Sequence, residues 1–125
     1  MSNETIKFKI LDYLRRNDYA SYVEMERIFE ECCFDYKGDL VICSIKCENV
    51  VFWVNWNKEA IDLINEMKEA GLIQQEVAHP LIYLLDGKGL NLPRVKRNIN
   101  YKTEHWLPLV FRLTKAGVEK SKQLN

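Results

Sequence analysis

The sequence predicts an α+β domain in which helical and extended segments follow one another along the chain. Three segments, residues 4–17, 22–33 and 58–70, carry apolar residues at the spacing of one helix face. Short stretches rich in β-branched and aromatic residues lie between and after these segments. A length of 125 residues is typical of one domain, so we expect residues 1–125 to form a single unit.

The first two helices have clear boundaries in the sequence. The apolar stripe of the first runs from Ile6 to Leu14, and Asn17 is expected to end this helix. The second begins with a capping box, in which the Ser21 hydroxyl accepts the backbone N–H of Glu24 and the Glu24 carboxylate accepts that of Ser21.

A strand pair is expected between the second and third helices. Residues 40–45 and 50–54 are rich in β-forming side chains, and residues 47–49 are predicted to form the turn that joins them. On the second strand, Val51 and Trp53 are expected to point to one face and their neighbours to the other.

The third helix is bounded by recognisable caps. Asn57 is the predicted N-cap of the helix at 58–70. Gly71 is the expected left-handed residue after its end, and Leu72 is the apolar partner of a Schellman motif.

The last third of the chain holds shorter elements. We expect short strands at 72–77 and 81–85, a long polar loop at 86–105, a last strand at 106–113 and a helix from Thr114 to about Leu124. Pro108 cannot donate a backbone hydrogen bond, so it indicates an edge position or a bulge in the last strand.

Two segments in this order carry a resemblance to a known family. AIDLINEMKEAGLI (60–73) is a helix that leads into a strand, and FRLTKAG (111–117) is a strand that leads into a helix. Both resemble the segments that flank the wing of winged helix-turn-helix domains, which bind DNA. The resemblance implies that residues 21–33 and 58–70 form the helix-turn-helix and that residues 86–105 form the wing. The chain departs from the family pattern by its long wing and by an extra β-hairpin between the second and third helices.

Positive charge is concentrated near the C-terminal end of a chain that is neutral overall. The 18 Lys and Arg residues balance 18 Asp and Glu residues, yet residues 86–125 hold nine basic and only three acidic side chains. The stretch 88–103 holds five basic side chains and no acidic one. A local cationic surface attracts polyanions such as nucleic acids, although the alternative is a solvated loop that only aids solubility.

Asparagine and aromatic side chains are interleaved with these cations. Asparagine can read base edges, and an aromatic ring can stack on an unpaired base. The predicted nucleic-acid contacts are therefore Lys88, Arg94, Lys96, Arg97, Asn98, Asn100, Tyr101 and Lys102. By contrast, the helix at 58–70 carries four acidic side chains and two lysines, which repel a phosphate backbone, so we do not expect it to insert deeply into a DNA groove.

Other candidate sites are weaker. Trp53 and Trp56 are candidates for a base-stacking platform, but tryptophan in an apolar strand is more typical of a core or a dimer contact. The four cysteines, Cys32, Cys33, Cys43 and Cys47, are adjacent or spaced C-x3-C, which favours reduced, buried thiols over zinc ligands. No cofactor or metal site is predicted. The sequence contains no catalytic motif, so an enzyme is not expected.

These observations favour a small non-enzymatic DNA-binding protein that captures DNA mainly through the basic wing. Two subtypes stay open: a transcription regulator on double-stranded DNA, acting as a homodimer, and a single-strand-binding accessory factor in replication or transfer of a mobile genetic element. The alternative is an adaptor whose acidic helix-turn-helix face binds a basic protein. The sequence has no signal peptide and no apolar span, so we expect a cytoplasmic protein without a membrane partner.

Overall fold

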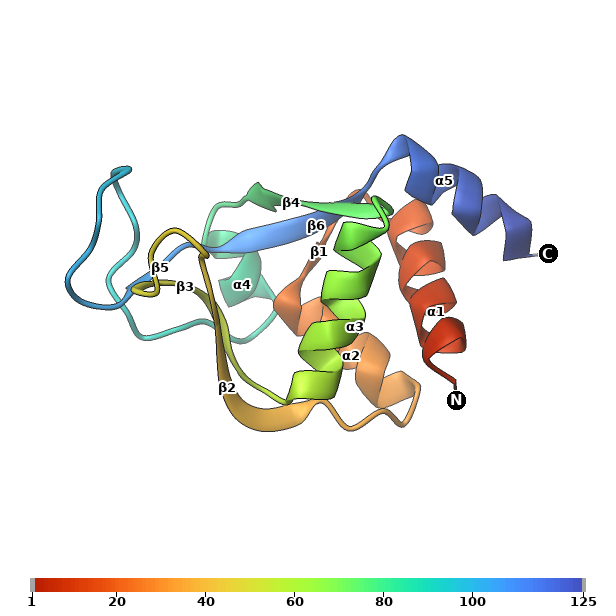
Figure 1. Ribbon diagram of the computed structural model, residues 1–125, viewed down its shortest axis with the longest axis horizontal. Coiled ribbons are helices and arrows are strands. Elements are labelled where there is room, and N and C mark those ends of the chain that lie inside the picture. Colours follow the sequence, from red (N-terminus) through yellow and green to blue (C-terminus); the bar gives the residue numbers. More distant parts are fainter. Residues whose placement is uncertain (1, 125) are drawn as a thin grey trace.

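The computed structural model describes residues 2–124 and contains five α-helices and two three-stranded sheets in this range (Figure 1). In chain order the elements are α1 (Asn3–Arg16), β1 (Ala20–Ser21), α2 (Tyr22–Glu31), β2 (Lys37–Cys43), β3 (Val50–Trp56), α3 (Lys58–Glu69), β4 (Ile73–Val77), α4 (Leu81–Leu85), β5 (His105–Trp106), β6 (Leu109–Leu113), α5 (Lys115–Ser121) and a 3₁₀ turn (Lys122–Leu124). The predicted α+β class is confirmed. None of the helices described is long and apolar enough to cross a bilayer.

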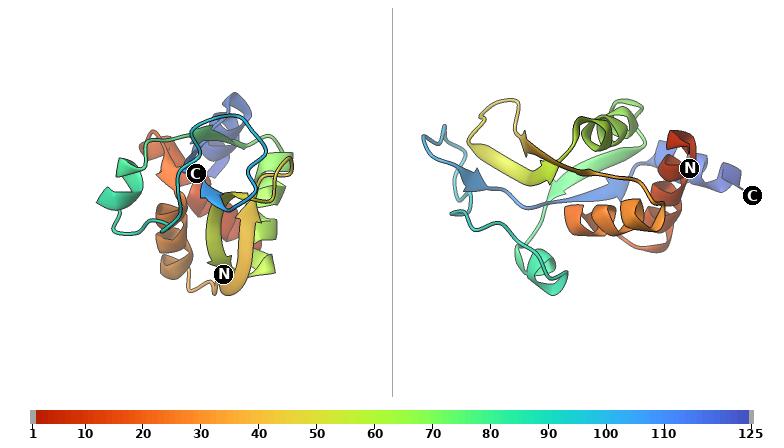
Figure 2. Two further views of the ribbon diagram at one scale, coloured as in Figure 1. Left: turned by 90° about the vertical axis from the view of Figure 1, so that its left-hand side faces the viewer. Right: turned by 90° about the horizontal axis from the view of Figure 1, so that it is seen from below.

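The two sheets are connected through the segment that follows residues 86–105, which we call the basic loop, because this segment supplies β5 to one sheet and β6 to the other. One sheet has the order β1-β6-β4, with β6 antiparallel to both neighbours. The other has the order β2-β3-β5, with an antiparallel β2–β3 pair and β5 parallel to β3. Helices α1 and α5 lie at one end of the molecule, and the basic loop extends from the other end (Figures 1 and 2).

The predicted helix caps are confirmed. The Ser21 hydroxyl accepts the backbone N–H of Glu24 at 3.1 Å, and the Glu24 carboxylate accepts that of Ser21 at 3.1 Å. At the end of α3, Gly71 has a φ of +73°, and the N–H of Leu72 reaches back to the carbonyl of Met67 at 3.0 Å. These contacts satisfy backbone groups that the ends of a helix leave without partners, and therefore local sequence fixes where α2 begins and where α3 ends.

A bulge in β3 brings one more aromatic side chain into the core than strict alternation predicts. Val51 and Trp53 are buried on one face, as expected. Asn55 has a φ of +67° and is skipped in the pairing with β2, since Leu40 pairs with Trp56 and the next residue, Val41, pairs with Val54. Because the bulge adds one residue, Trp56 turns to the same side as Trp53 and is fully buried.

The prediction of a strand at 81–85 is wrong, because this segment is the short helix α4. Both edges of β6 are already occupied by β1 and β4, so that sheet offers no edge next to β6 for another strand. Tyr83 anchors the helix: it is fully buried, and its hydroxyl donates to the carbonyl of Leu109 at 2.5 Å. A short apolar run does not by itself distinguish a strand from a helix.

The predicted last strand, 106–113, divides into two strands that belong to different sheets. β5 pairs with β3, and β6 pairs with β1 and β4. Pro108 lies between them, and its carbonyl accepts the N–H of Ala78 at 2.9 Å. The expectation of an edge position or a bulge within one strand is wrong, because the proline lies outside both strands and β6 is the central strand of its sheet.

Candidate nucleic-acid interface

The far part of the basic loop forms the end of the molecule opposite α1 and α5 (Figure 1). Its backbone is tied to the sheet, because the N–H of Val95 donates to the carbonyl of Trp106 at 2.9 Å and that of Trp106 donates to Pro93 at 2.8 Å. Six of the predicted contact residues are exposed here: Arg94, Lys96, Arg97, Asn98, Asn100 and Lys102. The structure therefore brings these six side chains to one region of the surface.

A groove of about 390 Å³ lies between the β2–β3 turn and residues 95–100. We call it the basic groove. Lys46, Lys96 and Arg97 supply its three cationic side chains, and Asn98 and Asn100 add amide groups. No carboxylate lines it. Within residues 2–124, none of the three cations forms an ion pair. Their positive potential is therefore not neutralised by a directly bonded partner.

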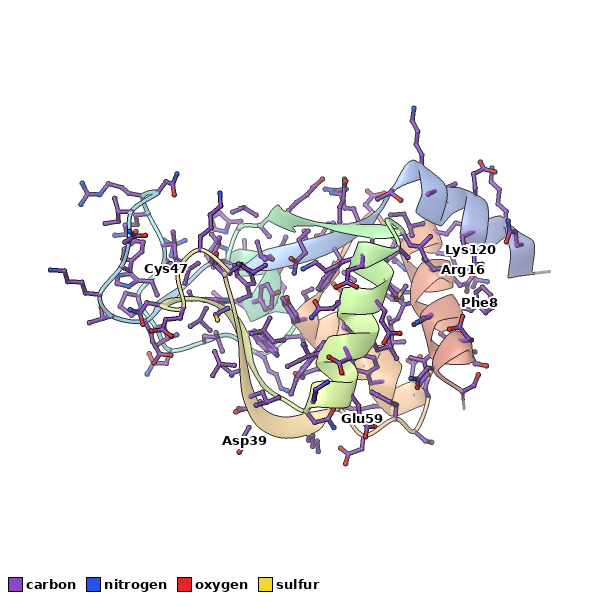
Figure 3. The ribbon with its side chains drawn as sticks, viewed as in Figure 1. Phe8, Arg16, Asp39, Cys47, Glu59 and Lys120 are labelled. Carbon is purple, nitrogen blue, oxygen red and sulfur yellow. The ribbon has the colours of Figure 1, made fainter. Side chains whose placement is uncertain are left out.

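Lys46 was missed by the sequence analysis. It is isolated in sequence from the other cations and belongs to the turn of the β2–β3 hairpin. Figure 3 labels its neighbour Cys47, which lies at the same end of the molecule as the basic loop. The only signal in the sequence was its position next to the predicted turn. That position does not show which loop the turn faces.

Tyr101 shapes the loop from within. Its hydroxyl oxygen accepts the backbone N–H groups of Lys96 and Arg97, both at 3.0 Å. Its carbonyl accepts the side-chain amide of Asn49 at 2.8 Å, and its ring packs on His105 with 3.9 Å between ring centroids. Tyr101 thereby links the two sides of the loop to the hairpin turn and holds the backbone that carries Lys96 and Arg97.

Lys88 is separated from the other predicted contacts. Its ammonium lies 2.5 Å from Oε1 of Glu26, whose side chain is only 5% exposed. The Lys88 side chain is 54% exposed, but its ammonium is held against a buried carboxylate, which it neutralises. Such a carboxylate needs a charged or hydrogen-bonding partner, because its desolvation otherwise costs several kcal/mol.

Glu26 also accounts for the two tryptophans of β3. The indole N–H groups of Trp53 and Trp56 both donate to its Oε2, at 2.8 and 2.9 Å. The two side chains are 3% and 0% exposed. The hypothesis that they form a base-stacking platform is therefore wrong, and so is a dimer contact through them. They belong to the core.

The acidic helix α3 is partly neutralised by intramolecular ion pairs. Lys7 from α1 reaches Glu66 at 2.7 Å, which raises the pKa of the Lys7 ammonium through hydrogen bonding and charge. Lys58 pairs with Asp62 within the helix at 2.5 Å. Glu59, at the start of α3, lies away from the basic loop (Figure 3). Negative charge remains on α3, but in a different part of the molecule from the basic groove.

The cysteines differ in their surroundings. Only Cys32 is buried, and burial raises the pKa of its thiol; Cys33 is exposed, and the other two are intermediate. The expectation of buried thiols is therefore confirmed for Cys32 alone. Across the described part of the chain, no three His, Cys, Asp or Glu side chains are grouped so that they could hold a metal ion.

Comparison with known proteins adds no assignment to this geometry: the chain matches no protein-family model, no curated protein and no solved structure.

Proposed function

We propose that this protein is a small non-enzymatic nucleic-acid-binding protein that captures DNA through the basic groove and the exposed cations around it. The observation that carries the proposal is the convergence of Lys46, Lys96 and Arg97 on one groove without a carboxylate. A polyanion gains affinity when such cations displace the counterions condensed on its phosphates. Arg94 and Lys102 extend the cationic surface beyond the groove.

We further propose that the architecture is a winged helix with an inserted hairpin. Three features support this proposal. Strands β4 and β6 are adjacent and flank the long segment 78–108, as the strands flanking a wing do. Helices α2 and α3 precede them in the expected places, and the β2–β3 hairpin lies between these helices. In this arrangement the wing, rather than α3, supplies the contacts with phosphates.

The loop offers little surface for stacking on unpaired bases, so its shape does not favour single-stranded over double-stranded DNA. The aromatic rings of Trp53 and Trp56 are buried and Tyr101 packs on His105, so stacking on bases is limited to the faces of the Tyr101–His105 pair that remain accessible. Capture is therefore mainly electrostatic in this proposal. It fits both a regulator that binds double-stranded DNA and an accessory factor of a mobile genetic element that binds single strands.

Fluorescence anisotropy with matched single- and double-stranded oligonucleotides tests the proposal directly. Measurements at about 50 and 200 mM salt are expected to show affinity that falls steeply with salt. The ratio of the two affinities separates the two subtypes. Absence of binding to both forms at the lower salt concentration would contradict the proposal.

A triple variant locates the binding surface. Replacing Arg94, Lys96 and Arg97 with alanine is expected to reduce the slope of log K against log salt by about 2–3, since each phosphate contact contributes about 0.7–0.9. The matched control is the triple variant Lys115→Ala, Lys120→Ala and Lys122→Ala, which removes the same three charges from α5 and the turn after it, at the opposite end of the molecule. An equal effect of the control would show that binding depends on overall charge.

An adaptor function is the second candidate, and the exposed side of α4 favours it. Leu84 and Leu85 are 66% and 79% exposed, and Leu81 is exposed beside them. Apolar side chains grouped on a surface are typical of protein contacts. An adaptor that docks a protein through this side, or through the acidic α3 on the opposite side of the molecule, would bind neither DNA form at low salt (Figure 2).

A further inference from the structure

A second groove, of about 500 Å³, lies between β2, α3 and β4. We call it the Lys68 groove. Its apolar lining includes Val41, Ile42, Phe52 and Ile61, and its polar lining includes Lys46, Asn65, Lys68 and Gln75. Mainly apolar walls with a few converging polar groups, in a volume of this size, are typical of small-molecule sites.

Lys68 is held in this groove by neutral partners. Its ammonium donates to the amide oxygen of Gln75 at 2.8 Å, and the amide nitrogen of Gln75 donates to the hydroxyl of the buried Tyr22 at 2.8 Å. In the described range of the chain, Lys68 forms no ion pair. Half-burial lowers the pKa of the Lys68 ammonium, and Glu69 opposes this effect only partly. The groove therefore contains a positioned cation without a directly bonded counter-charge.

The rim of the groove also carries apolar side chains that are exposed to solvent and do not belong to the core. Val41 is 47% exposed, and Ile45, beside the hairpin turn, is fully exposed. Both line the groove. A bound apolar group would remove this surface from water, which stabilises a complex by about 25 cal/mol per Å² before the costs of association.

We propose that the Lys68 groove binds a small apolar carboxylate, a molecule with one carboxylate on a short hydrocarbon chain. The carboxylate accepts a charge-assisted hydrogen bond from Lys68, and the chain lies against Val41, Ile42 and Ile61. Two cations line the groove: Lys46 also lines the basic groove, whereas the Lys68 ammonium is held against Gln75 inside this one. The mainly apolar walls favour a monoanion with a hydrocarbon chain over a polyanion, which gains affinity from several cations together. This groove adjoins the basic groove, because Ser44 and Lys46 line both, but Lys68 lines the Lys68 groove and not the basic groove.

Octanoate is a suitable probe of this chemistry. Acetate carries the same charge without the chain, and octan-1-ol carries the chain without the charge. An NMR titration of the methyl groups is expected to show saturable shifts at Ile42 and Ile61 with octanoate. Its affinity is expected to exceed that of octan-1-ol by about tenfold or more, the value of one charge-assisted hydrogen bond.

Two pairs of variants separate charge from packing. Lys68→Met keeps the apolar stem and removes the ammonium, so octanoate is expected to bind it no more tightly than octan-1-ol; Lys68→Arg is expected to retain the preference. Val41→Glu places a carboxylate at the rim, where it repels the ligand or pairs with Lys68, and it is expected to weaken octanoate binding by about tenfold. Val41→Gln, which adds no charge, is expected to leave octanoate binding unchanged. Val41 is exposed, so neither of its variants disturbs the core.

Three results would overturn the proposal. They are the lack of saturable octanoate binding up to about 1 mM, which corresponds to about −4 kcal/mol; equal binding of octanoate and octan-1-ol; and undiminished octanoate binding by Lys68→Met. Shifts confined to residues 95–100 would assign the anion to the basic groove instead and count against the Lys68 groove. Because octanoate binding is measured without DNA, its outcome is independent of the DNA titration.

Discussion

The ammonium of Lys88 lies 2.5 Å from the carboxylate of Glu26, and this ion pair ties the start of the basic loop to the core. Glu26 also accepts the indole N–H groups of Trp53 and Trp56 and, at 3.5 Å, the hydroxyl of Tyr36, so four donors converge on one buried carboxylate. The contact gives Lys88 a structural role that its place in a basic segment does not indicate.

Removing the Glu26 carboxylate is expected to destabilise the fold strongly. Glu26→Ala leaves two buried indole N–H groups without an acceptor, and we expect the free energy of unfolding to fall by about 3–5 kcal/mol, measured by urea denaturation. Lys88→Met, which removes the more exposed partner, is expected to cost about 1–2 kcal/mol. If Lys88→Met leaves stability unchanged but reduces the salt dependence of DNA binding, Lys88 belongs to the interface.

Lys46→Ala tests the residue that only the structure assigns to the basic groove. Loss of one phosphate contact is expected to reduce the salt slope of DNA binding by about 0.7–0.9. The same titration on Lys58→Ala, a lysine paired with Asp62 on α3, provides a control with an equal change in net charge. A similar slope for both variants would argue against the basic groove as the contact surface.

Tyr101→Phe is expected to loosen the basic loop without affecting the core. The backbone N–H groups of Lys96 and Arg97 lose their acceptor, so their hydrogen exchange should become faster, while the free energy of unfolding changes by about 1 kcal/mol or less. NMR exchange rates provide the measurement. Unchanged rates at both amides would show that the tyrosine hydroxyl does not organise this segment.

Gly117→Ala is expected to destabilise the packing of α5 against the end of α3. A Cβ at this position would lie 2.0 Å from the carbonyl oxygen of Leu72, so the backbone must move, at a cost of about 2–3 kcal/mol in thermal or urea unfolding. Gly71→Ala is the informative comparison. A Cβ there meets no atom, and its cost of about 1–2 kcal/mol comes from the positive φ alone. A smaller cost for Gly117→Ala than for Gly71→Ala would contradict the close approach.

The pH dependence of stability reports on Lys68. Its folded-state pKa is lowered by desolvation, so the unfolded chain binds more protons in the interval below 10.5, and this residue's contribution to stability rises with pH there. Lys68→Met should therefore be more stable than the parent at neutral pH, by less than about 1 kcal/mol because the ammonium is half-exposed, and this advantage should fade toward pH 10.5. Urea unfolding of both proteins at several pH values measures this difference in the free energy of unfolding. A difference that stays constant up to pH 10.5 would contradict the lowered pKa of Lys68.

Prediction from the sequence was successful where a few neighbouring residues decide the structure. The capping box at Ser21 and the Schellman end at Gly71 each depend on contacts within one turn of helix, so their signals are complete in the local sequence. The burial of Trp53 also follows from local alternation along β3. The concentration of positive charge near the C-terminal end is likewise a property of the sequence alone.

Prediction failed where distant residues compete for the same place. The apolar run of α4 suits a strand, but β1 and β4 already occupy both edges of β6. Nothing near Lys88 in the sequence indicates that its partner is Glu26, 62 residues away. Lys46 and the loop at 95–100 likewise meet only because the β2–β3 hairpin lies beside β5.

The sequence by itself therefore determined the α+β class, most helix boundaries and the presence of a cationic segment, because propensity, capping and charge act over a few residues. Only the tertiary structure decided which cations pair with carboxylates, that Trp56 is buried beside Trp53, and that Lys46 and Lys68 each line a groove. The physical reason is that burial and ion pairing depend on chain segments that are far apart in sequence and become neighbours only on folding.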